Sequence, residues 1–173
     1  MFCDISPTCY KIALQKEIIK RHIKNFLRHE RYADTRQSEP LPCLVADCSS
    51  HLIKRGKGID PVLQENKAVN IKLANARMNG ILIRPGETFS FWHLVGKTTK
   101  RKGYRDGRIL VRNHLLPGIG GGLCNLANTI HRVVLLSPLT VTEFHKHSDA
   151  LAPDEGARVP FSSGPSVFDN NGD

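Results

Sequence analysis

Hydrophobic residues near the start of the chain recur with the period of an α-helix. Within residues 7–29, Ile12, Ile19, Ile23 and Phe26 fall on one side of such a helix, and a basic residue stands at every fourth position on another side. This pattern predicts an N-terminal amphipathic helix with a buried apolar stripe. The polar, proline-containing stretch that follows predicts a linker. We therefore expect a helical extension with its linker over residues 1–42 and the main domain over 43–173.

Two further segments show helical periodicity, and short apolar runs between them predict strands. Residues 66–78 fit a helix that stops at Asn79-Gly80, and residues 123–136 fit a helix that stops at Ser137-Pro138. Strands are expected at residues 44–46, 81–84, 87–92, 108–111 and 139–147. Because helices and strands do not alternate regularly, as they would in a doubly wound sheet, this order predicts an α+β fold.

A run of glycines comes directly before the helix expected at residues 123–136. The sequence from residue 118 is Gly-Ile-Gly-Gly-Gly-Leu-Cys-Asn, so Cys124 follows Gly120, Gly121 and Gly122 and falls in the first helical turn. Glycines let the backbone approach a ligand, and the N–H groups at a helix start favour negative charge. The pattern predicts a presented thiol at Cys124 and ligand contacts at the three glycines. Their spacing does not fit a nucleotide-binding loop.

The segment after this helix offers a base for the thiol. If residues 139–147 are extended, Glu143, His145 and His147 lie on one face. In a thiol-dependent hydrolase or acyl transferase, Cys124 would be the nucleophile, His147 the base, and Glu143 or His145 the group that orients it. The positive N-terminal end of the helix stabilises a thiolate at Cys124 by only about 0.3–1 kcal/mol, so a strong nucleophile needs the histidine as well. Papain-like hydrolases have the same chain order.

Two other kinds of site use the same residues. His145 and His147 have a spacing found in metal sites, and Cys124, Glu143 or His131 could complete a zinc site with them. No second paired ligand motif accompanies the two histidines, so we expect no cofactor. The other alternative is a non-catalytic module that binds an anion at the glycine turn.

The net charge of +9 indicates an anionic partner. Basic residues and glycines share the segment 97–112, in which Arg101 and Arg105 are candidate anion ligands. Because Tyr104 is the one aromatic residue there and no nucleic-acid motif is visible, we expect a small anionic ligand ahead of nucleic acid. The basic side of the N-terminal helix suggests peripheral contact with an acidic membrane surface.

Cysteine usage and the apolar runs bear on the compartment. The chain has five cysteines, an odd number, with no C-x-x-C pair, which favours reduced thiols. No apolar run is long enough for a transmembrane helix, and the first residues lack the pattern of a secretory signal. We therefore expect a cytoplasmic protein, peripheral to the membrane at most, with all five thiols free.

Several unusual segments occur in the order in which one known family carries them. They are Glu65 to Asn70, Ile83 to Trp92, Gly103 to Arg105 and Gly118 to Cys124. The chain resembles the VanW family, named for an accessory protein of B-type vancomycin-resistance clusters, and the expected main domain is VanW-like. The resemblance implies an association with glycopeptide resistance and cell-wall metabolism, with a cell-wall precursor as the anionic ligand. It supplies no reaction.

The chain departs from the family pattern at three places. Asn125 stands where the family commonly has glutamine, and Phe144 and Lys146 stand within a segment where the family has more histidines. The usual aromatic and acidic C-terminal segment is replaced by residues 168–173. We therefore expect a shortened C-terminus that lacks a final strand.

Overall fold

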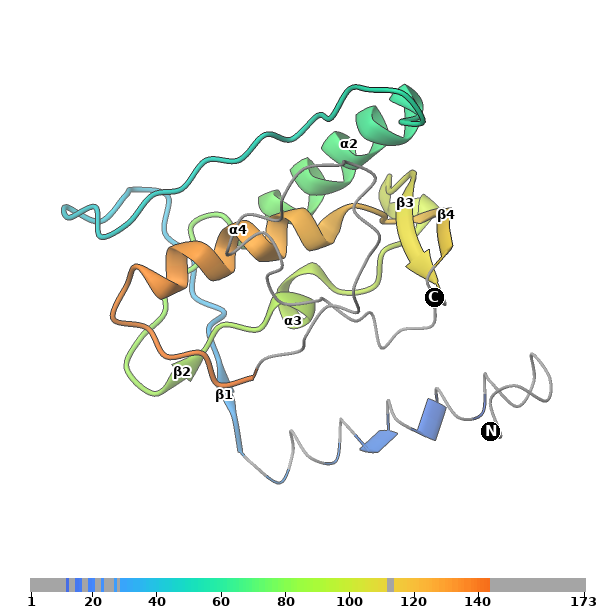
Figure 1. Cartoon of the computed structure of the whole chain (residues 1–173). Helices are drawn as coiled ribbons and strands as arrows, with labels where there is room; N and C mark the ends of the chain where they lie inside the picture. Colours follow the sequence, from blue (N-terminus) through green and yellow to red (C-terminus); the bar gives the residue numbers. More distant parts are fainter. Residues whose placement is uncertain are drawn as a thin grey trace.

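The structure is a computed structural model that describes residues 29–111 and 114–143, and a few single positions between 12 and 27. In chain order its elements are β1 (Arg31–Tyr32), α2 (Pro61–Met78), β2 (Glu87–Thr88), α3 (Phe91–Val95), the 3-10 helix η2 (Lys100–Lys102), β3 (Asp106–Val111), β4 (His114–Ile119) and α4 (Leu123–Leu135). β1 pairs with β2 in parallel, and β3 pairs with β4 as an antiparallel hairpin. The two pairs lie near opposite ends of α4 (Figure 1). This mixture of helices and small separate sheets agrees with the predicted α+β class.

Three helices enclose the core. Its buried members are Ala74 and Met78 from α2, Val95 from α3, Leu123 from α4, and Tyr104. Partly buried residues from the same elements, including Trp92, Leu126 and Ile130, pack against them. Burial raises the pKa of the Tyr104 phenol above its ordinary value, and the positive charge of Arg77 partly opposes this. The core therefore fixes the position of α4, which carries Cys124.

The helix α2 begins at Pro61, five residues earlier than the apolar pattern predicts. Asp60 is the reason, because its Oδ1 accepts hydrogen bonds from the amides of Val62 at 2.8 Å and Leu63 at 3.4 Å. Pro61 occupies the first helical position, where no amide hydrogen is needed. This first turn is held by its cap, since Val62 is 61% exposed and adds little burial. The predicted end at Met78 is correct.

Asp60→Ala is expected to lower the free energy of unfolding by about 1 kcal/mol, because two amides at the start of α2 lose their acceptor. Urea denaturation followed by circular dichroism measures the change. Asp60→Asn is the control, since its side-chain oxygen still accepts and most of the stability should remain. Equal midpoints for the alanine variant and the unmodified chain would contradict the assigned role of the cap.

The structure confirms one of the predicted strands and differs from the others. The strand expected at residues 108–111 is correct, as part of β3. The strand expected at 87–92 is wrong beyond Thr88, because Ser90 accepts the His93 amide at 3.4 Å and starts α3. Of residues 81–84, only Ile81 forms a bridge, with Arg36. Residues 44–46 and 139–143 are in no strand of the described structure.

Residues 31–37, predicted to be part of a linker, belong to the packed fold. Arg31 and Tyr32 pair with Glu87 and Thr88, and the Ala33 amide donates to the Thr88 carbonyl at 3.1 Å. Ala33 is only 1% exposed. The prediction is wrong here because these residues are held by partners 40 or more positions away, which a local polar composition does not reveal.

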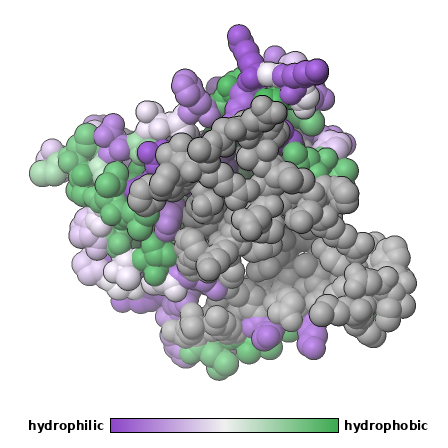
Figure 2. Space-filling view, in the orientation of Figure 1, coloured by the Kyte–Doolittle hydropathy of each residue, from purple (hydrophilic) through white to green (hydrophobic). Residues whose placement is uncertain are grey.

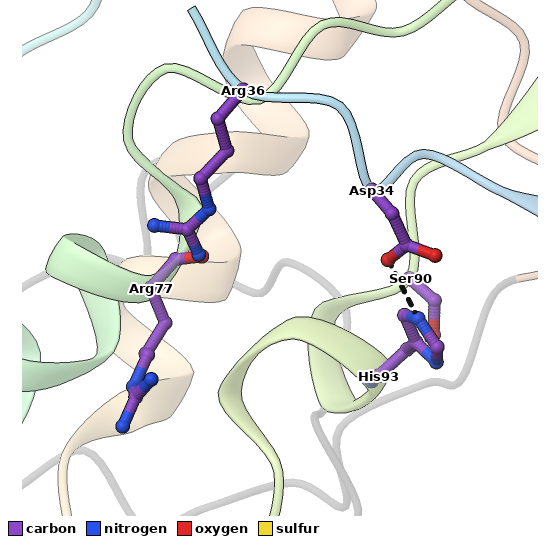
Figure 3. A network of polar contacts seen from close by, with 5 residues as sticks. All are labelled: Asp34, Arg36, Arg77, Ser90 and His93. Atoms are coloured by element: carbon purple, nitrogen blue, oxygen red, sulfur yellow. Dashed lines mark hydrogen bonds and ion pairs between the residues drawn. The ribbon is translucent and has the colours of Figure 1, made fainter. Parts of the chain in front are cut away.

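Polar side chains fasten the same segment to both α2 and α3 (Figure 3). Arg36 donates to the carbonyls of Ala76 and Arg77, which places its positive charge at the C-terminal end of α2. His93 Nε2 lies 2.8 Å from Asp34 Oδ1, and its ring stacks on Tyr32 with centroids 4.5 Å apart. The segment therefore bridges two helices of the core.

The described positions between residues 12 and 27 are helical, and the rest of that segment lies outside the described residues. Ile12, Ile19 and Ile23 are 59%, 57% and 54% exposed. The predicted burial of these three side chains is therefore wrong, because helical periodicity shows which residues share a side but not what covers it. Phe26 lies outside the described residues. Within the described part of the chain, no helix has the length and apolar character needed to cross a membrane.

Candidate functional site at the glycine turn

Two asparagines of α2 hold the glycine turn, which we define as residues 118–122. Asn70 is fully buried, and its Nδ2 donates to the carbonyls of Gly121 at 3.0 Å and Arg105 at 2.9 Å. Its Oδ1 accepts the Arg105 amide at 2.8 Å. Asn66, one helical turn earlier, donates to the Asp106 carbonyl at 2.9 Å. One side of α2 thus fixes both the turn and the start of β3.

Glycines let the backbone of the turn touch that of β3. A Cβ on Gly121 would lie 2.7 Å from the Arg108 amide nitrogen and closer still to Gly107, and a Cβ on Gly107 would meet Gly121 in the same way. Gly120 has φ +79° and would place a Cβ 2.8 Å from the hydroxyl oxygen of buried Thr98. Its amide donates to the Arg105 carbonyl at 3.0 Å. The turn is consequently rigid and closely packed.

The N-terminus of α4 begins at a glycine. Gly122 is the N-cap residue, with φ +94°, and no side-chain cap hydrogen bond is present there among the described residues. Lys67 of α2 lies against it, since a Cβ on Gly122 would be 2.8 Å from Lys67 Cδ and closer still to the preceding carbons. Backbone amides at such a helix start attract anions. The turn therefore combines a positive helix end with a lysine stem beside it.

Positive charges gather around Lys67. Burial lowers the pKa of Lys67 below its ordinary value of 10.5, and the charges of Arg108 and Lys54 lower it further. This lowered pKa shows that the charged ammonium of Lys67 is less favourable in the folded protein than in the unfolded chain. This arrangement would favour an anion that offsets the charge.

Cys124 lies where the sequence predicts it, in the first turn of α4, and is partly buried. Cys43, Cys48 and Cys124 are all free, and the other two cysteines lie outside the described residues. Asn128 follows one helical turn after Cys124, and its buried Oδ1 has no hydrogen-bond partner among the described residues. His131 stands seven residues after Cys124, roughly 10.5 Å along the axis, which is too far for it to serve as a direct base.

Of the proposed partners of Cys124, Glu143 and His131 lie within the described residues. Glu143 is exposed in a segment that forms no strand, and His145 and His147 lie outside the described residues. The thiol–imidazole pair and the zinc site therefore stay predictions. Among the described residues, no three side chains of histidine, cysteine, aspartate or glutamate gather closely enough to hold a metal ion.

The two predicted arginines differ in how they relate to the turn. Arg105 is tied to it through its backbone, which bonds to both Asn70 and Gly120, and its side chain is exposed. Arg101 is exposed on η2. Sequence reasoning missed the residues of other elements that contact the turn, Lys67, Asn70, Thr98 and Arg108, and it missed Asn66, which bonds to the start of β3. Two asparagines spaced by four within a helix were the signal for the first contacts, because this spacing places both on one side.

Comparison with known proteins identifies the family. The family model described as "VanW like protein" matches residues 66–173. The chain is 40% identical over 116 residues to "Vancomycin B-type resistance protein VanW" of Enterococcus faecalis (strain ATCC 700802 / V583), a match that covers 67% of this chain and 42% of that protein. It is 32% identical over 84 residues to "Uncharacterized protein YoaR" of Bacillus subtilis (strain 168), covering 49% and 28%. No solved structure matches significantly.

These matches confirm the predicted resemblance: the chain belongs to the VanW family. The matched region begins at Asn66 and includes the whole glycine turn, Lys67, Asn70 and Cys124. The chain spans less than half the length of either relative.

Proposed function

We propose that this chain binds an anionic cell-wall precursor at the glycine turn and contributes in this way to glycopeptide resistance. The observation that carries the proposal is the uncapped N-terminus of α4, with Lys67 lying against its first residue. The name of the Enterococcus faecalis relative, a vancomycin B-type resistance protein, supports the link to vancomycin resistance. The proposed location is the cytoplasm, with peripheral contact to acidic membranes through the basic N-terminal helix.

Preorganisation strengthens this argument. A phosphate or carboxylate binds well to backbone amides when those amides need no rearrangement on binding. Here the turn is already held by Asn70 and by contact between Gly107 and Gly121. The exposed side chain of Arg105 starts beside the turn, and Arg101 adds positive charge nearby in sequence, which would speed the approach of an anion.

Titration calorimetry with the soluble uridine-diphosphate-linked muramyl pentapeptide tests the proposal. Gly122→Ala is expected to weaken binding by about tenfold or more, because the new methyl group would displace Lys67 and strain a φ of +94°. Gly86→Ala is the matched control, since Gly86 also has positive φ, at +79°, but has open space around it.

Random DNA of similar charge separates a specific site from general adhesion. Binding through counterion release falls steeply with salt for every polyanion, whereas a site at the turn should prefer the precursor and depend on Gly122. Absence of precursor binding by the unmodified chain, or an equal loss for DNA and precursor, would overturn the proposal.

A thiol-dependent hydrolase or acyl transferase acting on cell-wall amides is the second candidate function. The observation in its favour is that Cys124 lies in the first turn of that same uncapped helix. Amides there could donate to a developing oxyanion. In this mechanism the Cys124 sulfur attacks the amide carbonyl carbon, and His147 takes the thiol proton and gives it to the amine that leaves when the C–N bond breaks. Water or an acceptor amine then releases the acyl group from Cys124, while Glu143 or His145 orients the imidazole. Zinc held by Cys124 and the two histidines is the competing arrangement.

Iodoacetamide should alkylate Cys124 faster than Cys48 at neutral pH. Both thiols are partly buried, so Cys48 serves as the control. The helix start alone predicts about a two- to fivefold difference, and a histidine partner would add to it. His147→Ala should then reduce the difference, as peptide mass spectrometry over time would show. Equal rates at the two thiols would remove the nucleophile hypothesis.

A further inference from the structure

A small pocket lies between the start of α2 and the β3–β4 hairpin. Its volume is about 170 Å³, and Leu63, Gln64, Arg108, Leu115, Leu116 and Pro117 are among the residues that line it. Pockets for drug-sized ligands start at roughly 300 Å³, so this one admits only a short group or one end of a larger ligand.

The hairpin supplies an apolar wall. Leu115 and Leu116 are 40% and 46% exposed, and both line the pocket. Hydrophobic residues are visible in Figure 2 on the side where Figure 1 places the hairpin. Pro117 stands directly opposite Arg108 in the β3–β4 register, so the apolar wall and a positive charge meet at that pair.

Positive charge lies at the α2 side of the pocket. Lys67 follows the pocket residue Gln64 by one helical turn, and the amide of Lys54 donates to Gln64 Oε1 at 3.2 Å. Lys67 and Arg108 both border the glycine turn, because the Lys67 stem lies against Gly122 and the Arg108 amide nitrogen would be 2.7 Å from a Cβ on Gly121. The positive charges of Arg108 and Lys54 also lower the pKa of Lys67, after the larger effect of burial. Lys67 also contacts Gly122, so the positive end of α4 borders the same group.

Two carboxylates near the pocket have partners of their own. Asp60 lines the pocket, and its Oδ1 accepts two amides at the start of α2. Asp106, two residues before Arg108, forms an ion pair with Lys100 at 3.7 Å. Within the described residues, neither Lys67 nor Arg108 forms an ion pair with a carboxylate, so both can pair with an external oxyanion.

We infer that the pocket and these cations form one site for an oxyanion that carries a short aliphatic group. The phosphate or carboxylate lies between Lys67, Arg108 and the α4 N-terminus, and the aliphatic group lies against Leu115 and Pro117, which share the Arg108 face of the hairpin. This inference rests on the proposed function, because it names the residues that hold the anionic end of the precursor. It also replaces Arg101 with Lys67 and Arg108 as the principal cations.

Titration of the full chain with butyl phosphate, butanoate and inorganic phosphate tests the site. Lys67→Met keeps an unbranched stem against Gly122 and removes the charge, so it should weaken all three ligands by about tenfold or more. Its thermal midpoint should stay equal or rise, because the partly buried ammonium no longer lies beside two like charges. Lys72→Met makes the same substitution at an exposed position of the same helix, α2, and should change binding less than about twofold.

The apolar wall has its own test. Leu115→Ser should weaken butyl phosphate by about threefold or more while leaving inorganic phosphate unchanged, because Leu115 lies on the same face of the hairpin as Pro117 and Arg108, and only the butyl group contacts it. Comparison of butyl phosphate with butanoate identifies which oxyanion the site prefers. Equal weakening of butyl phosphate and inorganic phosphate by the serine variant would overturn the apolar half of the inference.

The outcomes also separate this inference from the proposed function. Equal binding by Lys67→Met and the unmodified chain would overturn the inference, and it would leave the proposed function standing if the muramyl precursor still binds. Lys67-dependent binding of butyl phosphate without precursor binding would support the site and overturn the proposed function. Failure of every anion to bind the unmodified chain would overturn both.

Discussion

Asn70→Leu is expected to lower the free energy of unfolding by about 3–5 kcal/mol, one of the largest effects of any single polar substitution in the described fold. Leucine has a similar volume but leaves the Arg105 amide and the Gly121 carbonyl without their partner, and the Arg105 carbonyl keeps only its hydrogen bond from the Gly120 amide. Each buried backbone group without a hydrogen bond costs about 1–3 kcal/mol. Asn70 is 0% exposed, so solvent does not reach the site in the folded chain. Urea denaturation monitored at two wavelengths measures the loss.

Two further substitutions show whether the hydrogen bonds cause the loss. Asn66→Ala removes one partly buried bond, to the Asp106 carbonyl, and should cost about 1 kcal/mol. Asn70→Asp keeps an acceptor for the Arg105 amide but sets a carboxylate against two carbonyls, so it should lie nearer the leucine variant than the unmodified chain. If Asn70→Leu cost no more than Asn66→Ala, the three bonds would not hold the turn together.

The local sequence pattern predicted those helix positions and ends that are determined by residues within the helix or next to it in sequence. The helix α4 was found because its apolar residues recur at helical spacing and Ser137-Pro138 ends it. The end of α2 was found for the same reason. The start of α2 was missed because Asp60 and Pro61 determine it through a cap, while periodicity detects only burial.

Partners distant in sequence explain most of the errors in the fold. The two-residue strands β1 and β2 pair across more than 50 residues, and neither is long enough to show an alternating pattern. The β4 strand contains Pro117 and Gly118, both of which lower strand propensity, and its pairing with β3 supports it nonetheless.

The sequence predicted the glycine turn and the position of Cys124, but it did not predict the side chains that hold the turn in place. The glycines from 120 to 122 and the position of Cys124 follow from the sequence itself, since glycines before an apolar helix form a turn. Asn70 was missed because a polar residue in a helix is ordinarily assigned to the exposed side, whereas here the backbone of the turn satisfies it. Arg108 stood in the same basic segment as Arg101, and only the β3–β4 register shows that it faces Pro117.

Gly121→Ala is expected to cost at least about 3 kcal/mol of unfolding free energy, or to prevent folding. Its Cβ would lie 2.7 Å from the Arg108 amide nitrogen and closer to Gly107, so backbone, which moves less easily than a side chain, would have to move. Gly86→Ala is the control. It has positive φ but no atoms within 4 Å of its Cβ, and should cost only the strain of about 1 kcal/mol.

The double variant Gly107→Ala with Gly121→Ala decides whether the two glycines share one contact. Each new methyl group forces the same separation of β3 from the glycine turn, so the second should cost much less once the first has moved the backbone. Thermal and urea denaturation of both single variants and the double variant give the coupling. If the loss of unfolding free energy in the double variant equalled the sum of the losses in the two single variants, each methyl group would disturb a different part of the fold. A double variant less destabilised than the sum, with precursor binding lost in all three, would show that binding depends on this one contact between backbones.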